Sequence, residues 1–112
     1  LAQPEVTIHV VPASLPKQKF LHTEWFYPDC LADYYGVEVY SEEHWNMIEA
    51  YLRLAFERGI NVAYTPILTP ALDTLIGKDR TTVQLVKIKM TEGRFEFDFG
   101  LLRRWIRLCN RV

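Results

Sequence analysis

The sequence predicts an α/β fold that opens on a strand–helix–strand unit and continues through a β-hairpin to a second helix. Three observations carry this prediction. A clearly signalled helix begins after Ser41 and stops at Gly59, and short apolar segments lie directly before and after it. Two alternating apolar runs then surround a turn that contains Gly93. A strand, a helix and a strand in close succession form a βαβ unit, whose two strands are parallel.

Length and composition fit one domain of a soluble protein. The 112 residues allow a modest core, and 49% of them are hydrophobic and 24% charged. The net charge of −1 gives no general attraction to nucleic acid or to an anionic membrane. No apolar run approaches the roughly 20 residues of a membrane-spanning helix, and no signal-peptide pattern is visible. We expect no nucleic-acid or membrane partner, and the compartment is not indicated.

Residues 1–19 read as an extended lead-in. Apolar and polar residues alternate from Val6 to Val10, which is the period of a half-buried strand, and Pro12 and Pro16 interrupt any regular structure beyond it. The chain starts without Met and stops within an apparent helix, so both ends resemble cuts in a longer protein. We interpret this segment as the end of a preceding β domain followed by a linker.

The first strand of the βαβ unit is expected in residues 20–26, which are rich in aromatic side chains. A short helical turn should follow, with Asp29 as its cap and Gly36 as its stop. Ile60 begins an almost uninterrupted apolar run that extends to Leu68. Such a run is typical of a parallel strand that is buried on both faces.

The main helix has the strongest local signals in the chain. Ser41 is a preferred N-cap, and Glu42 and Glu43 place negative charge at the positive end of the helix dipole. Apolar residues recur every three or four positions up to Gly59.

Alternation around Gly93 predicts an antiparallel hairpin in residues 86–99, which we interpret as an excursion from the main sheet. Asp98 should then cap a second helix, whose apolar face includes Trp105 and Cys109.

Residues 20–40 hold the side chains best suited to binding. In βα folds, sites form at the carboxyl ends of strands. Aromatic rings interleaved with carboxylates suit a sugar, because the C–H face of the sugar packs on a ring while polar groups bind its hydroxyls. The candidate substrate-binding residues are His22, Glu24, Trp25, Asp29 and Tyr35.

Structural roles remain open for these residues. Trp25 fits a core position equally well, Asp29 fits a helix cap, and His22 fits a hydrogen-bonded core histidine. Glu24 is the most informative of them, because a carboxylate in a strand is costly to bury without a partner. Tyr35 would also fit the underside of a loop.

Spacing alone identifies no complete catalytic set. Glycosidic hydrolysis usually uses two carboxylates. Glu24 and Asp29 are a possible pair of carboxylates, but the residues between them do not determine the distance between the two carboxyl groups. Cys30 and Cys109 fit two reduced thiols better than a disulfide, and their spacing does not suit zinc. No metal or cofactor is expected.

The string HTEWFYPDCLADYYGVEVYSEEHW, with TPILTPALDT and TTVQLV after it, resembles the N-terminal part of the catalytic domain of glycoside hydrolase family 123. The resemblance covers residues 20–112. It implies the opening part of a (β/α)₈ TIM barrel in a bacterial enzyme. That enzyme would hydrolyse terminal β-linked N-acetylhexosamine, N-acetylgalactosamine above all, by acetamido-assisted catalysis with retention.

The catalytic pair of that family is an adjacent Asp-Glu, and this sequence contains no such dipeptide. The resemblance therefore places the pair beyond Val112, leaves this piece inactive alone, and gives its residues a role in binding the sugar. The alternative is a non-catalytic carbohydrate-binding or scaffold relative of the barrel. Part of a barrel should also self-associate through exposed strand edges.

Overall fold

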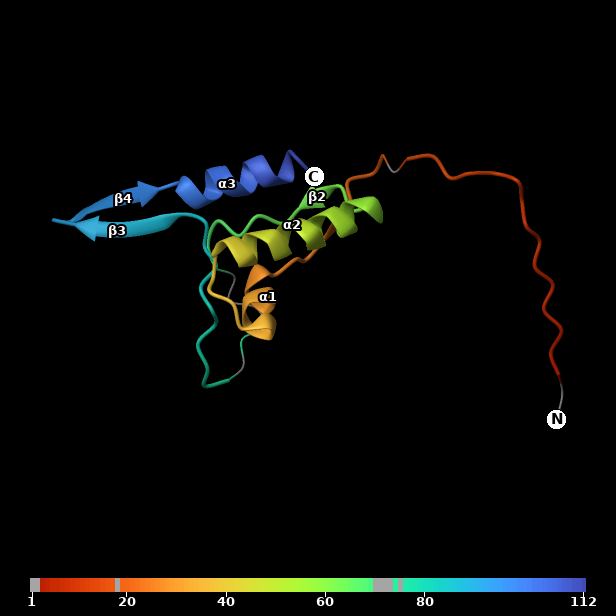
Figure 1. Ribbon diagram of the computed structural model, residues 1–112, viewed down its shortest axis with the longest axis horizontal. Helices are drawn as coiled ribbons and strands as arrows, with labels where there is room; N and C mark the ends of the chain where they lie inside the picture. The colour runs from red at the N-terminus through yellow and green to blue at the C-terminus, as the bar shows by residue number, and fades with distance from the viewer. Residues whose placement is uncertain (1–2, 18, 70–73, 75) are drawn as a thin grey trace.

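The computed structural model describes residues 3–17, 19–69, 74 and 76–112, and it shows a mixed α/β arrangement of helices and two small sheets (Figure 1). A parallel strand pair and three helices form the body, and an antiparallel hairpin projects from one end of it (Figure 1). Among the described residues, no helix has the length and apolar character needed to cross a membrane. The elements in order are β1 (Thr23–Glu24), α1 (Pro28–Tyr35), α2 (Glu42–Glu57), β2 (Val62–Ala63), β3 (Lys87–Thr91), β4 (Arg94–Asp98) and α3 (Gly100–Cys109).

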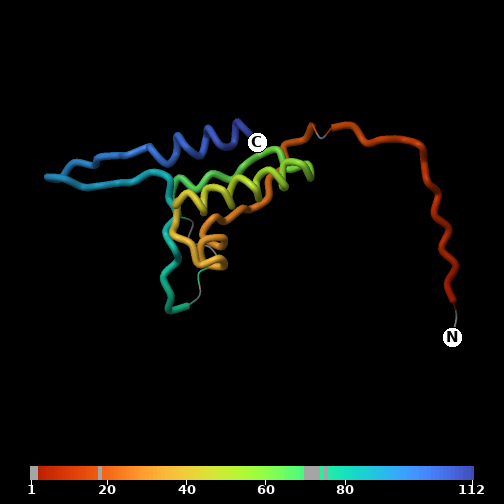
Figure 2. Tube along the Cα trace, viewed as in Figure 1, coloured from red at the N-terminus to blue at the C-terminus, as the bar shows by residue number. Residues whose placement is uncertain are grey.

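Residues 3–17 run away from the body as an exposed, extended chain (Figures 1 and 2). They contain no strand, so the alternation from Val6 to Val10 does not form the strand that it predicts in this structure. This segment and the hairpin give the chain a radius of gyration of 20.0 Å, compared with about 13 Å for a compact domain of this length. The interpretation of residues 1–19 as the end of a β domain stays a prediction.

The predicted βαβ unit is confirmed. β1 and β2 are parallel neighbours, with Thr23 opposite Val62 and Glu24 opposite Ala63, and α2 lies between them in the sequence. Both strands are shorter than predicted, because the ladder contains only two residue pairs. β2 is half-buried rather than buried on both faces, since β1 is its only paired neighbour in the described part of the chain.

The helical turn predicted after Pro28 is a full helix, α1, and one detail of the prediction is wrong. Asp29 is not the cap: the N-cap is Tyr27, and Pro28 occupies the first turn, where its missing N–H costs nothing. The Asp29 carboxylate is instead bound by a distant arginine. Gly36 ends the helix with φ of +67°, as predicted.

α2 begins as its sequence predicts, because the Ser41 hydroxyl accepts the backbone N–H of His44 at 3.2 Å. The buried His44 ring joins α2 to α1. Its Nδ1 accepts the Tyr40 N–H at 2.9 Å, so Nε2 carries the proton and donates to the Pro28 carbonyl at 2.8 Å. This ring fixes the start of α1 against the start of α2.

The core lies between α2 and α3. The Trp45 and Trp105 rings are 6.4 Å apart at 58°, and Phe26 packs on Trp105 from the β1 side. On the surface, Arg104 of α3 donates two 2.6 Å hydrogen bonds to Glu42 of α2 while its guanidinium lies over Trp45. The buried residues of this core are Leu31, Trp45, Ile48, Leu52, Leu85, Trp105 and Leu108.

The hairpin is confirmed as antiparallel, and its turn has φ of +51° at Glu92 and +75° at Gly93. Positive φ at both central residues is typical of the tight turns that match strand twist. The N-cap of α3 is Phe99, whose side chain makes no capping hydrogen bond. Asp98, the residue before it, takes this role, because its Oδ1 accepts the Gly100 N–H at 2.8 Å.

Candidate functional site

Three aromatic rings line the carboxyl ends of the two parallel strands. Trp25 and Tyr27 follow β1, and Tyr64 follows β2 directly. Trp25 and Tyr27 meet edge to face with centroids 6.1 Å apart, and Tyr27 and Tyr64 do the same at 6.1 Å. We call Trp25, Tyr27 and Tyr64 the strand-end row. A row of rings at this position is suited to packing on the apolar face of a flat ligand.

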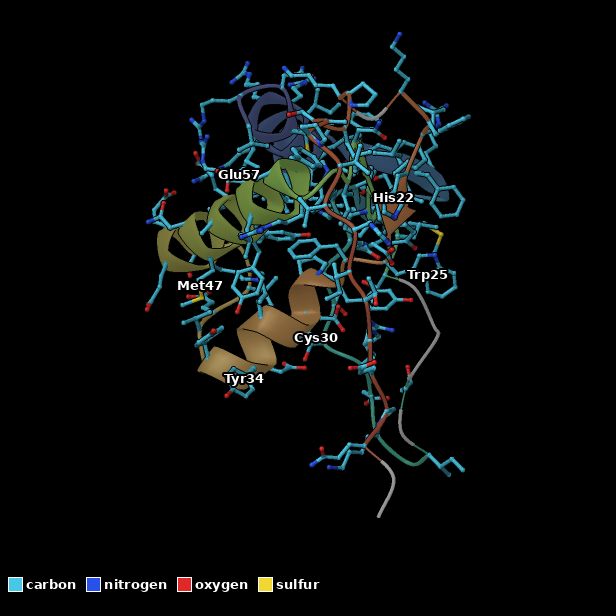
Figure 3. The ribbon with its side chains drawn as sticks, turned by 90° about the vertical axis from the view of Figure 1, so that its right-hand side faces the viewer. His22, Trp25, Cys30, Tyr34, Met47 and Glu57 are labelled. Carbon is cyan, nitrogen blue, oxygen red and sulfur yellow. The ribbon has the colours of Figure 1, made fainter. Side chains whose placement is uncertain are left out.

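Trp25 is the exposed member of the row. It is 62% exposed, while the other two tryptophans, Trp45 and Trp105, are buried in the core. Figure 3 shows Trp25 on the side of the molecule that faces away from α2 and α1. Its ring is therefore open to a ligand, and the core role that the sequence left open for Trp25 does not apply.

His22, which directly precedes β1, and Glu24, the last residue of β1, contact one another. Glu24 Oε1 is 3.0 Å from His22 Nε2, and both side chains are exposed to solvent. The Glu24 carboxylate is therefore not buried at a cost but has a partner and free acceptor capacity. Two such groups can bind the hydroxyls of a sugar.

The side chain of Asn61 anchors β1. Its Oδ1 accepts the His22 N–H at 2.8 Å, and its Nδ2 donates to the Phe20 carbonyl at 2.8 Å. The His22 carbonyl in turn accepts the backbone N–H groups of Asn61 and Val62. The position of His22 thus depends on this amide side chain together with two backbone hydrogen bonds.

Asp29 lies behind the row in a buried ion pair. Its two oxygens accept Arg80 Nε at 2.7 Å and Nη2 at 3.1 Å, and Asp29 is only 4% exposed. The hydrogen bonding of Arg80 to the Asp29 carboxylate, which accepts, raises the pKa of Arg80, so the guanidinium stays charged. The guanidinium also lies 4.6 Å from the centre of the Tyr27 ring. Asp29 therefore reaches the strand-end row through Arg80 rather than directly.

A polar hollow of 370 Å³ surrounds this pair. Thr81 closes one side of it by donating to Asp33 Oδ1 at 2.7 Å. Carboxylates, a guanidinium, an ammonium group and hydroxyls all line this space, so it is suited to a hydroxyl-rich ligand. The lining residues are Tyr27, Asp29, Cys30, Asp33, Thr74, Lys78, Asp79, Arg80 and Thr81.

Tyr35 is placed elsewhere. Its hydroxyl hydrogen-bonds that of Tyr51 on α2 at 2.8 Å, and this bond raises the pKa of Tyr35. Its ring packs edge to face on Tyr34, which Figure 3 shows on α1, away from Trp25. The structure therefore places Glu24 and Trp25 at the carboxyl end of β1, His22 directly before the strand and Asp29 behind the strand-end row, and it does not bring Tyr35 there.

Sequence reasoning did not select Arg80, Tyr64 or Asn61. Tyr64 had a usable signal, because it stands at the end of an apolar strand candidate. Arg80 and Asn61 had none, since each acts on a segment that is far away in the sequence. Cys30 and Cys109 are thiols and not a disulfide, and burial raises the pKa of Cys109. Within the described ranges, no three His, Cys, Asp or Glu residues are grouped to hold a metal ion.

A family model described as "Glycoside hydrolase 123, catalytic domain" matches residues 25–112. The matched range includes the whole strand-end row and the Asp29–Arg80 pair, and it begins directly after Glu24. No curated protein matches the chain.

Proposed function

The chain belongs to the glycoside hydrolase 123 catalytic-domain family, and we propose that it forms the sugar-binding opening of a (β/α)₈ barrel. The substrate in this proposal is a terminal, β-linked N-acetylhexosamine, N-acetylgalactosamine above all. One observation carries the binding role: exposed Trp25 packs against Tyr27 directly after β1, and Glu24, the last residue of the strand, pairs with His22. Sites of βα barrels form at this end of the strands.

In the proposed complex, the C–H face of the sugar packs on Trp25. Glu24 accepts hydrogen bonds from sugar hydroxyls, and His22 holds the carboxylate in place from 3.0 Å. The Asp29–Arg80 pair keeps Tyr27 at the back of the site, with the guanidinium 4.6 Å from its ring centre. These residues bind and orient the sugar, and none of them has to transfer a proton to the glycosidic oxygen.

The proposed chemistry uses the acetamido group of the substrate. Its oxygen attacks the anomeric carbon while a general acid protonates the leaving oxygen, and water then opens the cyclic intermediate with net retention. An adjacent Asp-Glu pair would orient the acetamido group and supply the acid. This sequence has no Asp-Glu dipeptide, so we place the pair on a later part of the barrel and expect no hydrolysis from residues 1–112 alone.

Exposed apolar surface beside the strands supports the barrel proposal. A groove of 320 Å³ lies between the second half of α2 and the parallel strands. Glu24 and Trp25 belong to its lining, and its apolar part includes Leu54, Ala55 and Val62. In a closed barrel, neighbouring βα units cover such surfaces on both sides of each strand pair.

The binding role is tested by replacing Trp25 with Ala in the full-length enzyme. Loss of one stacking contact of about 1.4 kcal/mol should lower kcat/KM about tenfold on a chromogenic N-acetyl-β-galactosaminide. Most of the loss should be in KM. The matched control is Tyr34→Ala, which removes an aromatic ring that is 83% exposed on α1.

Three results decide the proposal. A selective loss in Trp25→Ala supports the site, and equal kinetics in both variants with intact folding overturns it. Sugar binding without hydrolysis by the full-length wild-type protein would favour the alternative of a non-catalytic relative. The same assay with the gluco epimer decides which N-acetylhexosamine is preferred.

A further inference from the structure

The β3–β4 hairpin has one face that is entirely apolar. Ile88 lies opposite Phe97 and Met90 lies opposite Phe95, so these four side chains share one side of the ladder. Phe99 extends the row, with its ring stacked on Phe97 at 6.3 Å and 23°. The five side chains are between 42% and 68% exposed. We call them the hairpin face.

The opposite side of the hairpin is charged and balanced. Lys87 lies opposite Asp98, and Lys89 lies opposite Glu96. From Lys87 to Asp98 the chain has three basic residues and three acidic residues, so the hairpin carries no net charge. Two hairpins can therefore approach one another without electrostatic repulsion.

The chemistry of the hairpin face favours a protein partner over a sugar. Sugar sites combine rings with hydrogen-bonding groups, as the strand-end row does, but Ile, Met and Phe side chains offer no hydrogen-bond donor. Met and Phe are enriched in the cores of protein interfaces, and charged residues are depleted there. The charged side of the hairpin would form the solvated rim.

The area of this face is close to the smallest that a stable dimer uses. A Phe side chain accounts for about 200 Å², so the exposed parts of the three rings give roughly 300 Å², and Ile88 and Met90 bring the face to roughly 500 Å². Two copies packed face to face would bury roughly 1,000 Å² in total, which is the lower limit for a specific interface. A two-fold axis needs only this one surface, because the same patch serves both subunits.

We propose that the hairpin face is a homodimer interface, in which the hairpins of two copies of this protein pack face to face about a two-fold axis. The contact is between faces rather than strand edges. Pairing two β4 edges about Glu96 would bring two glutamates together. Pairing two β3 edges would likewise bring Lys87 and Lys89 close to the lysines of the second copy, so charge repulsion disfavours both edge contacts. The proposal does not depend on the sugar-binding role of the strand-end row.

The test is sedimentation of the full-length protein over a wide concentration range. The wild-type protein should dimerise. Phe97→Glu, which places a charge at the centre of the face, should weaken the dimer at least tenfold. The matched control is Glu96→Gln, which alters the neighbouring residue on the charged side and should leave the dimer constant unchanged.

Thermal unfolding separates loss of association from loss of folding. Phe97 is exposed in the monomer, so the Phe97→Glu monomer should keep the unfolding temperature of a dissociated wild-type monomer. A wild-type protein that stays monomeric at all concentrations overturns the proposal, and so does a Phe97→Glu protein that dimerises as tightly as wild type. A monomeric wild type that Phe97→Glu destabilises would show that its own chain covers the face, which also overturns it.

Discussion

Asp29 and Arg80 form a two-point ion pair across 51 residues of sequence, with Nε···O and Nη2···O distances of 2.7 and 3.1 Å. The pair joins the first turn of α1 to the segment before β3. Because the guanidinium also lies over the Tyr27 ring, one interaction fixes both the polar hollow and the back of the strand-end row. The position of the proposed sugar site therefore depends on a contact that local structure does not create.

Replacing Asp29 with Asn should destabilise the protein by about 3 kcal/mol, because it removes the negative charge that compensates the largely buried guanidinium and weakens their two-point contact. The free energy of unfolding, measured by chemical denaturation, checks this value. The double variant Asp29→Asn/Arg80→Met should recover part of the loss, since it also removes the buried positive charge that Asp29 compensates. A double variant that is less stable than Asp29→Asn would contradict this account of the pair.

Asn61→Ala should loosen β1, because it removes the 2.8 Å hydrogen bonds to the His22 N–H and the Phe20 carbonyl. We expect a loss of about 1–2 kcal/mol in stability and a higher KM with little change in kcat. Asn46→Ala, at an exposed position on α2, is the control and should change stability by less than about 0.5 kcal/mol. If folded Asn61→Ala keeps the wild-type KM, the hydrogen bonds of Asn61 do not position the sugar-binding residues, and the prediction is contradicted.

Tyr40 should make the protein sensitive to alkaline pH. Burial, with a smaller contribution from the Asp29 carboxylate, raises the pKa of Tyr40 above its ordinary 10.0. The folded protein therefore holds this proton more tightly than the unfolded chain does. The associated stability is fully present below pH 10.0 and falls as the pH rises toward the folded-state pKa.

Tyr40→Phe removes this titration and the hydrogen bond that the hydroxyl donates to the Val83 carbonyl. It should cost about 1 kcal/mol at neutral pH and show a shallower stability decline above pH 10.0. Denaturant titrations on both sides of that pH give the two slopes. Equal slopes in wild type and Tyr40→Phe would refute the prediction.

Local signals predicted the elements whose stabilising groups are close in sequence. Ser41 caps α2, Gly36 and Gly59 adopt positive φ at helix ends, and Gly93 forms the hairpin turn. The parallel pairing of β1 and β2 followed from the helix between them. The lengths of these strands could not be predicted, because they depend on which neighbours pair with them rather than on their own residues.

The site was predicted in part for the same reason. The sequence placed His22, Glu24 and Trp25 together because they are neighbours at a strand end. It named Asp29 both as a candidate for sugar binding and as a helix cap, because an acidic residue near a helix start has the capping role most often. The partner that determines its actual role is Arg80, and no periodicity connects the two. Tyr35 was grouped with the site by sequence proximity, but the α1 helix turns it toward Tyr51.

The central claim is that this part of the enzyme binds the sugar and leaves proton transfer to residues elsewhere. Glu24→Gln in the full-length enzyme tests it most directly, because the amide keeps the shape of the side chain and removes its charge. We predict that KM on an N-acetyl-β-galactosaminide rises about tenfold, while kcat stays within a few-fold of wild type. A fall in kcat of about a thousandfold at unchanged KM would make Glu24 a catalytic residue and contradict the claim.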